Sequence, residues 1–238
     1  MITVLGWIWW LVLPLRRKLA VANHQAAFPE RDAGELRRTV GELAWSYVEL
    51  LLGKRAQIEG LEHLEGGAIA LAGHFGGWDL AMVSLAEATP VTVFVREPRD
   101  RIPAWIIRRI RRRTGMELLA PRGDKAAAYT ALERGRVVLF IQDQRHDDGL
   151  LSPYFGRPVR TSAGFAAMAW RCEAKPVGIE QWRDDNGRHQ VRIRPLELPI
   201  PDDREQALAA LTDASQRFYE QVVRRRPWAW WWLHDRWR

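Results

Sequence analysis

Residues 68–79 read AIALAGHFGGWD, and this stretch indicates an α/β fold. An uncharged apolar run of strand length ends at a glycine, His74 follows, and Gly76 and Gly77 permit a turn before a helix-forming segment. Ligand-binding and catalytic groups of open α/β sheets gather beyond the carboxyl ends of strands, which is where this pattern places His74. The stretch therefore predicts a strand, a turn that carries a functional histidine, and a helix that begins near Asp79.

Helix and strand patterns alternate on both sides of this stretch. We expect helices over 33–52, 78–88, 103–113, 125–134, 163–172 and 204–226, and strands over 57–59, 68–72, 91–95, 137–141, 176–181 and 190–194. After residue 141 we expect a loop that contains Gly and Pro, with 153–158 (PYFGRP) as its fixed part. The alternation predicts an α/β fold: a single domain with a mixed, largely parallel sheet flanked by helices. A chain of 238 residues suits one such domain.

The N-terminal residues 2–15 (ITVLGWIWWLVLPL) are uncharged, and Arg16, Arg17 and Lys18 follow at once. As a helix they reach roughly 21 Å, against about 30 Å of hydrocarbon in a bilayer. We therefore expect a short apolar anchor helix at the membrane surface, with its three tryptophans at headgroup depth, although a first core helix is the alternative. The predicted organisation is a membrane-associating helix over 1–20 and the α/β domain over 21–238.

Composition adds an excess of tryptophan and arginine. Eight of the 13 Trp lie near the two chain ends, the net charge is +7, and only four of the 36 basic residues are Lys. Both features suit a membrane surface or nucleic acid, but a coding bias towards arginine is an equally simple cause. The closing segment 224–238 (RRRPWAWWWLHDRWR) fits core packing or a second interfacial patch. The single cysteine, Cys172, excludes an internal disulfide and a cysteine-based zinc site.

His74 and Asp79 form the first candidate site. Residues five apart on an ideal helix point about 140° away from each other, so the two meet only if His74 stays on the glycine turn. Asp79 would then hold one imidazole nitrogen while the other takes a proton from a hydroxyl or an amine. The structural alternative is a histidine and an acid that serve a helix N-terminus.

Several separated motifs resemble those of one acyltransferase family. They are AAFPE (26–30), IEGLEHL (58–64), GHFGGWD (73–79), REP (96–98), IQDQ (141–144), PYFGRP with the following TSAG (161–164), and PWAWWWLHDRW (227–237). In this order they resemble lipid A biosynthesis acyltransferases of the lauroyl-transferring type, within the lysophospholipid acyltransferase superfamily and its His-x4-Asp/Glu motif. The resemblance implies a glycerolipid acyltransferase-like fold, with His74 as general base and Asp79 as its support.

The resemblance also implies the reaction and its partners. A fatty acyl group passes from a thioester of acyl carrier protein or coenzyme A to a hydroxyl of a lipid A precursor or a related glycolipid. The thioester is a co-substrate, and no metal or other cofactor is expected. The implied location is the cytoplasmic face of the inner membrane, as a peripheral or monotopic protein.

Further residues are candidates for substrate binding. The backbone N–H groups of Gly76 and Gly77 suit an oxyanion. Arg96 matches a family position and suits a phosphate of either substrate, unless it pairs on the surface with Glu97 or Asp100. The resemblance assigns acceptor binding and site shaping to the strand end that carries Asp143, Gln144 and Arg145.

Other charged and polar features are weaker candidates. The basic helix expected over 103–113 suits docking to anionic lipid or an acidic carrier protein, or simply a solvated face. We interpret His146, Asp147 and Asp148 as a solvated turn and His234 as structural.

The sequence departs from the family pattern in its length, in two residues of the closing motif, and at Asp235, where the family usually has an Arg beside His234. The chain is shorter than typical members, most of the difference is N-terminal, and Trp228 and Ala229 stand where the closing motif usually has Glu-Gln. The Pro-Glu-Gly-Thr-Arg block of enzymes that acylate lysophosphatidic acid is missing, which favours a glycolipid acceptor.

Three rival interpretations stay open. One is a basic nucleic-acid-binding module, which would be indifferent to His74. Another is a lipid-binding protein that has lost the chemistry. The third is an acyltransferase for a different acceptor, such as a lysophospholipid, another glycolipid or an aryl lipid.

Overall fold

The computed structural model describes residues 1–94, 114–120, 125–172, 176–198 and 200–237. Its main sheet has seven strands in the order β1-β9-β8-β2-β5-β3-β4. These are β1 (Gln57–Glu59), β2 (Ala68–Ala72), β3 (Val91–Phe94), β4 (Glu117–Leu119), β5 (Val137–Ile141), β8 (Pro176–Arg183) and β9 (His189–Pro195). Five neighbouring strands from β8 to β4 are parallel. Strand β9 runs antiparallel to β8 and parallel to β1. The expected single α/β domain with a mixed, largely parallel sheet is confirmed.

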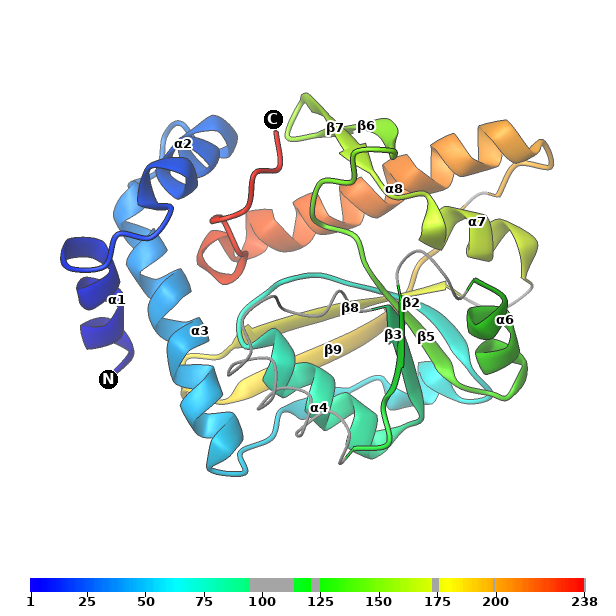
Figure 1. Cartoon of the computed structure of the whole chain (residues 1–238), viewed down its shortest axis with the longest axis horizontal. Helices are drawn as coiled ribbons and strands as arrows, with labels where there is room; N and C mark the ends of the chain where they lie inside the picture. Colours follow the sequence, from blue (N-terminus) through cyan, green and yellow to red (C-terminus); the bar gives the residue numbers. More distant parts are fainter. Residues whose placement is uncertain (95–113, 121–124, 173–175, 199, 238) are drawn as a thin grey trace.

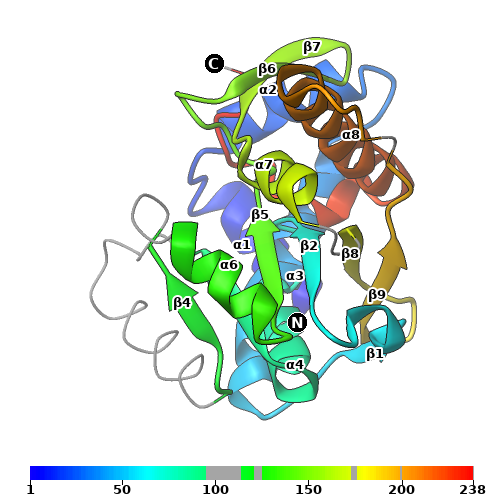
Figure 2. The ribbon, with the colours of Figure 1, turned by 90° about the vertical axis from the view of Figure 1, so that its right-hand side faces the viewer.

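Helices cover both faces of this sheet (Figure 1). The described α-helices are α1 (Ile2–Leu11), α2 (Arg17–Ala27), α3 (Leu36–Leu51), α4 (Trp78–Ala88), α6 (Lys125–Glu133), α7 (Gly164–Arg171) and α8 (Arg204–Arg225). Short 3-10 turns are η1 (Ala33–Glu35), η2 (Leu61–Leu64) and η3 (Pro227–Ala229). Figure 2 shows α7 and α8 together on one side of the sheet and α4 on the opposite side.

Alternation along the central strands explains these two layers. Ala68, Ala70 and Ala72 of β2 face α4, where small side chains let the helix approach the sheet. Ile69 and Leu71 face the opposite way, into the larger core that α6, α7 and α8 share with the C-terminal segment. Every residue of β2 is buried, as expected of a central parallel strand.

The N-terminal region consists of two helices where the sequence suggested one. The expected 1–20 segment contains α1 and the start of α2, and a turn that includes Pro14 separates them. Backbones of α1 and α3 touch at two glycines: a Cβ on Gly6 would lie 2.3 Å from the Arg37 carbonyl oxygen, and one on Gly41 would lie 2.2 Å from that of Ile2. Across the described residues, every helix is too short or too polar to span a bilayer.

The tryptophans at the two ends are placed differently from each other. Trp7 is exposed on α1, but Trp9 is buried and donates its indole N–H to the Leu15 carbonyl over 3.0 Å. The expectation that all three N-terminal tryptophans sit at headgroup depth is therefore wrong for Trp9. At the other end Trp230 and Trp232 are fully buried, so the closing cluster packs into the core.

One expected element has a different structure, and another lies outside the described residues. The segment expected as a loop around 153–158 is a hairpin of β6 (Leu150–Tyr154) and β7 (Arg157–Thr161). Its turn residues Phe155 and Gly156 have φ of 50° and 69°, which is the backbone that a tight two-residue hairpin requires. Strand β4 (Glu117–Leu119) was not expected either. The helix expected over 103–113 lies outside the described residues.

Candidate active site

The register of β2 against β5 brings two site residues together. The strands are parallel neighbours, and Ala72 lies opposite Ile141. Two residues beyond each of these positions the chain reaches His74 and Asp143, so both side chains emerge at the same edge of the sheet. His74 Nδ1 lies 2.9 Å from Asp143 Oδ1.

Asp143 is buried, and both of its carboxylate oxygens have partners. Oδ2 accepts the backbone N–H of His74 over 2.9 Å and the indole N–H of Trp230 over 2.8 Å. Burial alone raises the pKa of Asp143, but the charge of His74 and these hydrogen bonds outweigh it and lower that pKa to about 2. Asp143 is therefore a carboxylate at neutral pH and orients the imidazole.

The sequence assigned Asp143 to acceptor binding, whereas its observed contact is with the histidine ring. His74 and Asp143 each lie two residues beyond the end of a strand, and this equal spacing could have indicated that they meet. The inference also requires that β2 and β5 are neighbours, which the sequence did not specify.

Asp79 lies in the first turn of α4 and is buried. Its Oδ2 accepts a hydrogen bond from the Tyr47 hydroxyl of α3 over 2.9 Å. This contact joins the start of α4 to α3 and involves Tyr47, which sequence reasoning did not single out as a site residue.

The glycine turn between β2 and α4 is tightly enclosed. The Gly76 N–H donates to the Ala229 carbonyl over 2.6 Å, so this donor already has an acceptor within the protein. Of the two glycine N–H groups, that of Gly77 is therefore the better candidate donor to an oxyanion. A Cβ on Gly77 would lie 2.6 Å from Ser46 Cβ and 2.9 Å from His189 Cε1, so only glycine fits without a shift.

The remaining expected site residues have different surroundings. Gln144 Nε2 lies 3.4 Å from His74 Nδ1, at the edge of the site. Arg145 Nε lies 2.8 Å from Asp147 Oδ1. Arg96 lies outside the described residues.

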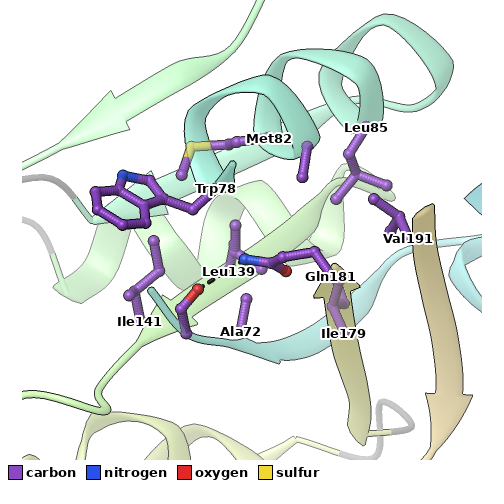
Figure 3. Close-up of a pocket in the computed structure, with 11 residues that line it drawn as sticks. Ala72, Trp78, Met82, Leu85, Leu139, Ile141, Ile179, Gln181 and Val191 are labelled. Carbon is purple, nitrogen blue, oxygen red and sulfur yellow. Dashed lines mark hydrogen bonds between the residues drawn. The ribbon is translucent and has the colours of Figure 1, made fainter. Parts of the chain in front are cut away.

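A narrow, largely apolar cavity lies between α4 and the sheet (Figure 3). Its volume is about 20 Å³, room for little more than one water molecule, and it opens to solvent. Its lining comes from α4 and from the facing side chains of β2, β5, β8 and β9: Ala72, Gly73, Trp78, Ala81, Met82, Leu85, Leu139, Ile141, Ile179, Gln181 and Val191. Trp78 lies next to His74, with ring centroids 5.1 Å apart. Leu85 is further along α4 and lies beside Val191 of β9.

Ala229, Trp230 and Trp231 of the C-terminal segment 227–237 form another wall of the site. The Trp231 N–H donates to the His74 carbonyl over 3.0 Å, and Phe75 pairs with Trp230 in an antiparallel bridge. The Trp231 ring packs against Trp78 with 5.6 Å between centroids. Burial lowers the pKa of His234 to about 4, and the charges of Asp143, Arg236 and His74 also act on it. The sequence showed an aromatic cluster here, but not its contact with the histidine turn.

These features define an α/β protein with a histidine–carboxylate pair next to a small apolar cavity, an arrangement suited to a proton-transfer step. Comparison with known protein families assigns the chain to a particular family. The model of the bacterial lipid A biosynthesis acyltransferase family matches residues 1–238, the whole chain, and the chain belongs to this family. It is therefore an acyltransferase, which requires an acyl donor and a lipid acceptor. No curated protein matches the chain.

Proposed function

We propose that this enzyme transfers a fatty acyl group from a thioester of acyl carrier protein or coenzyme A to a hydroxyl of a lipid A precursor or a related glycolipid. The observation that carries the proposal is the hydrogen bond between His74 Nδ1 and the buried carboxylate of Asp143, beside an apolar cavity. A histidine held in this way is a general base for an alcohol, and the apolar lining of the cavity suits a hydrocarbon chain that moves the lining side chains apart when it binds.

In the proposed reaction Asp143 holds Nδ1, so His74 meets the acceptor through Nε2. The acceptor oxygen forms a bond to the thioester carbonyl carbon while its proton passes to Nε2. The tetrahedral intermediate then expels the thiolate, which takes the proton back from the imidazolium. The products are an ester and a free thiol, and the enzyme returns to its starting protonation state.

Other residues are proposed to support this step. The Gly77 N–H is the candidate donor to the oxyanion, and Arg96, Gln144 and Arg145 are candidate contacts to the polar parts of the substrates. Asp79, the acid of the His-x4-Asp motif, is proposed to assist His74 from the first turn of α4.

The proposal is tested with the purified full chain and thioester donors of both kinds. A lipid A precursor, a lysophospholipid and an aryl lipid are offered as acceptors, and mass spectrometry identifies the acylated product. We expect thiol release coupled to acylation of the glycolipid. Preference for another acceptor would overturn the acceptor assignment, and no transfer from any donor would overturn the whole proposal. Salt-sensitive binding to DNA that is unchanged in His74→Ala would favour the nucleic-acid alternative instead.

We expect the end of the cavity at Leu85 to limit the length of the acyl chain that the enzyme accepts. Leu85 is buried at that end, so Leu85→Ala should lengthen the space for the chain. We expect the ratio of rates with longer and shorter acyl donors to rise about tenfold, the effect typical of a change of one or two methylenes in an apolar pocket. Competition between donors of increasing length measures the ratio.

The matched control is Leu80→Ala. Leu80 is an equally buried leucine of α4, but it packs towards α3 with Leu50 and Val83 instead of lining the cavity. Both changes should cost about 2–5 kcal/mol of stability through the cavity they create. An equal shift in chain-length preference in both variants would contradict the assignment of the cavity to the acyl chain.

Membrane association is proposed through α1 and the turn that follows it. Their outward side chains are apolar and exposed: Val4, Trp7, Ile8, Leu11, Val12, Leu13 and Leu15. Arg16 and Lys18 are also exposed directly behind them, where they suit anionic headgroups. We propose that this surface lies in the interface of the inner membrane on its cytoplasmic face.

A double replacement tests this surface. Leu11 and Leu13 are 68% and 65% exposed, so changing both to aspartate removes apolar area without opening the core. We expect binding to anionic phospholipid vesicles to weaken at least about tenfold, since a fully buried leucine contributes roughly 1.5–3 kcal/mol. Vesicle co-sedimentation measures the change. Aspartate at Leu51 and Leu52, which are 65% and 70% exposed on α3 and just after it, is the control; equal weakening there would argue against a specific surface.

A further inference from the structure

The indole N–H of Trp230 donates to a carboxylate and not to a backbone carbonyl. A buried indole N–H needs an acceptor, and a backbone carbonyl usually satisfies it, as Pro227 does for Trp232 over 2.7 Å. Trp230 instead donates to Asp143 Oδ2 over 2.8 Å. Its partner is the carboxylate whose other oxygen holds His74.

The backbone of Trp230 is tied to the same histidine. It pairs with Phe75 in an antiparallel bridge, and hydrogen bonds on either side join Gly76 to Ala229 and Trp231 to His74. The indole ring and the histidine turn are therefore fixed relative to each other by backbone hydrogen bonds.

Packing immobilises the ring of Trp230 as well. It is 1% exposed and makes edge-on contacts with Tyr154, Trp232 and Trp237, with centroids 5.5, 4.7 and 6.0 Å away. A donor held so firmly leaves the carboxylate few alternative orientations.

We propose that Trp230 is a positioning residue for acyl transfer: its indole N–H fixes the carboxylate of Asp143 so that the opposite oxygen holds the imidazole of His74. The inference rests on the proposed function of the His74–Asp143 pair. It gives Trp230 a part in catalysis in addition to its place in the core.

The test replaces one N–H group and keeps the aromatic ring. We expect Trp230→Phe to lower kcat about tenfold, the usual cost of a lost hydrogen bond to a charged group, with KM for the acyl donor within about twofold. The Asp143 carboxylate that has lost a donor stabilises the His74 imidazolium more strongly, which raises the pKa of His74. The acid limb of the plot of kcat against pH should therefore move to higher pH. The other titratable groups around the pair keep their places in this variant: Tyr154, Tyr219, His234 and Arg236.

Trp232→Phe is the matched control. It removes the same group from an equally buried tryptophan of the same segment, but the lost acceptor is a neutral carbonyl away from the pair. We expect kcat within about twofold of the unaltered enzyme and an unmoved acid limb. Equal losses in the two variants, or an unmoved limb in Trp230→Phe, would overturn the inference.

A double variant separates positioning from general loss of structure. If Trp230 acts through Asp143, then Trp230→Phe should cost little more in an Asp143→Asn background, and fully additive losses would contradict it. The indole N–H resonance of Trp230 gives a readout independent of activity and of the folding of Trp230→Phe. It should shift in Asp143→Asn, and an unchanged resonance overturns the inference. If the unaltered enzyme transfers no acyl group, the proposed function fails, and the resonance still shows whether the contact exists.

Discussion

Replacement of His74 with alanine is expected to lower kcat for acyl transfer about a thousandfold, because a positioned general base contributes roughly 10²–10⁴-fold to such a step. The rest of the site stays in place: the imidazole side chain is 23% exposed, and the turn is held through the backbone atoms of residues 74–76. Initial rates of thiol release with a saturating donor measure the loss. The KM of the donor should change little, since the proposed binding site of its chain is the cavity and not the imidazole.

Two controls accompany this prediction. His63→Ala removes an exposed histidine on η2 and should leave the rate unchanged. Added imidazole should restore part of the activity of His74→Ala, because a free base can enter the vacated space. Undiminished turnover in His74→Ala would rule out the proposed mechanism.

Asp143→Asn is expected to give the second largest loss, at least about a hundredfold in kcat. The carboxylate has a pKa of about 2, so the change removes a full negative charge at the pH of any ordinary assay. An amide stabilises the imidazolium poorly and can leave the ring in the wrong tautomer, the effect known for the acid of catalytic triads. Measuring kcat for Asp79→Asn in the same way shows how much each of the two acids contributes to the rate.

The outcome that would contradict this assignment is specific. Asp143→Asn with a normal rate, together with an inactive Asp79→Asn, would show that Asp79 supports His74 and that Asp143 is structural. Glu180→Gln controls for the loss of a buried carboxylate, since Glu180 is buried on β8 and pairs with Arg225 over 2.6 Å. The rate of Glu180→Gln should stay within about threefold of the unaltered enzyme, because the partners of this carboxylate are Arg225 and Arg226.

The alternation of apolar strands and amphipathic helices was sufficient to predict the fold class. Most described elements lie within a few residues of their expected positions, because strand and helix periods are local properties of the chain. The hairpin of β6 and β7 escaped this reasoning: two prolines and a glycine suggested a loop, whereas Pro153 lies opposite Pro158 across two extended strands. Proline is tolerated there because this two-stranded sheet leaves its outer edges unpaired.

For the site, the sequence by itself determined His74, its place after a buried strand, the glycines that permit the turn, and the family. The tertiary structure decided which groups meet that histidine. Asp143 reaches it from β5 and Trp230 from the C-terminal segment, 69 and 156 residues away along the chain. Only the register of neighbouring parallel strands and the packing of the last residues bring these groups within hydrogen-bonding distance, and neither is encoded in local spacing.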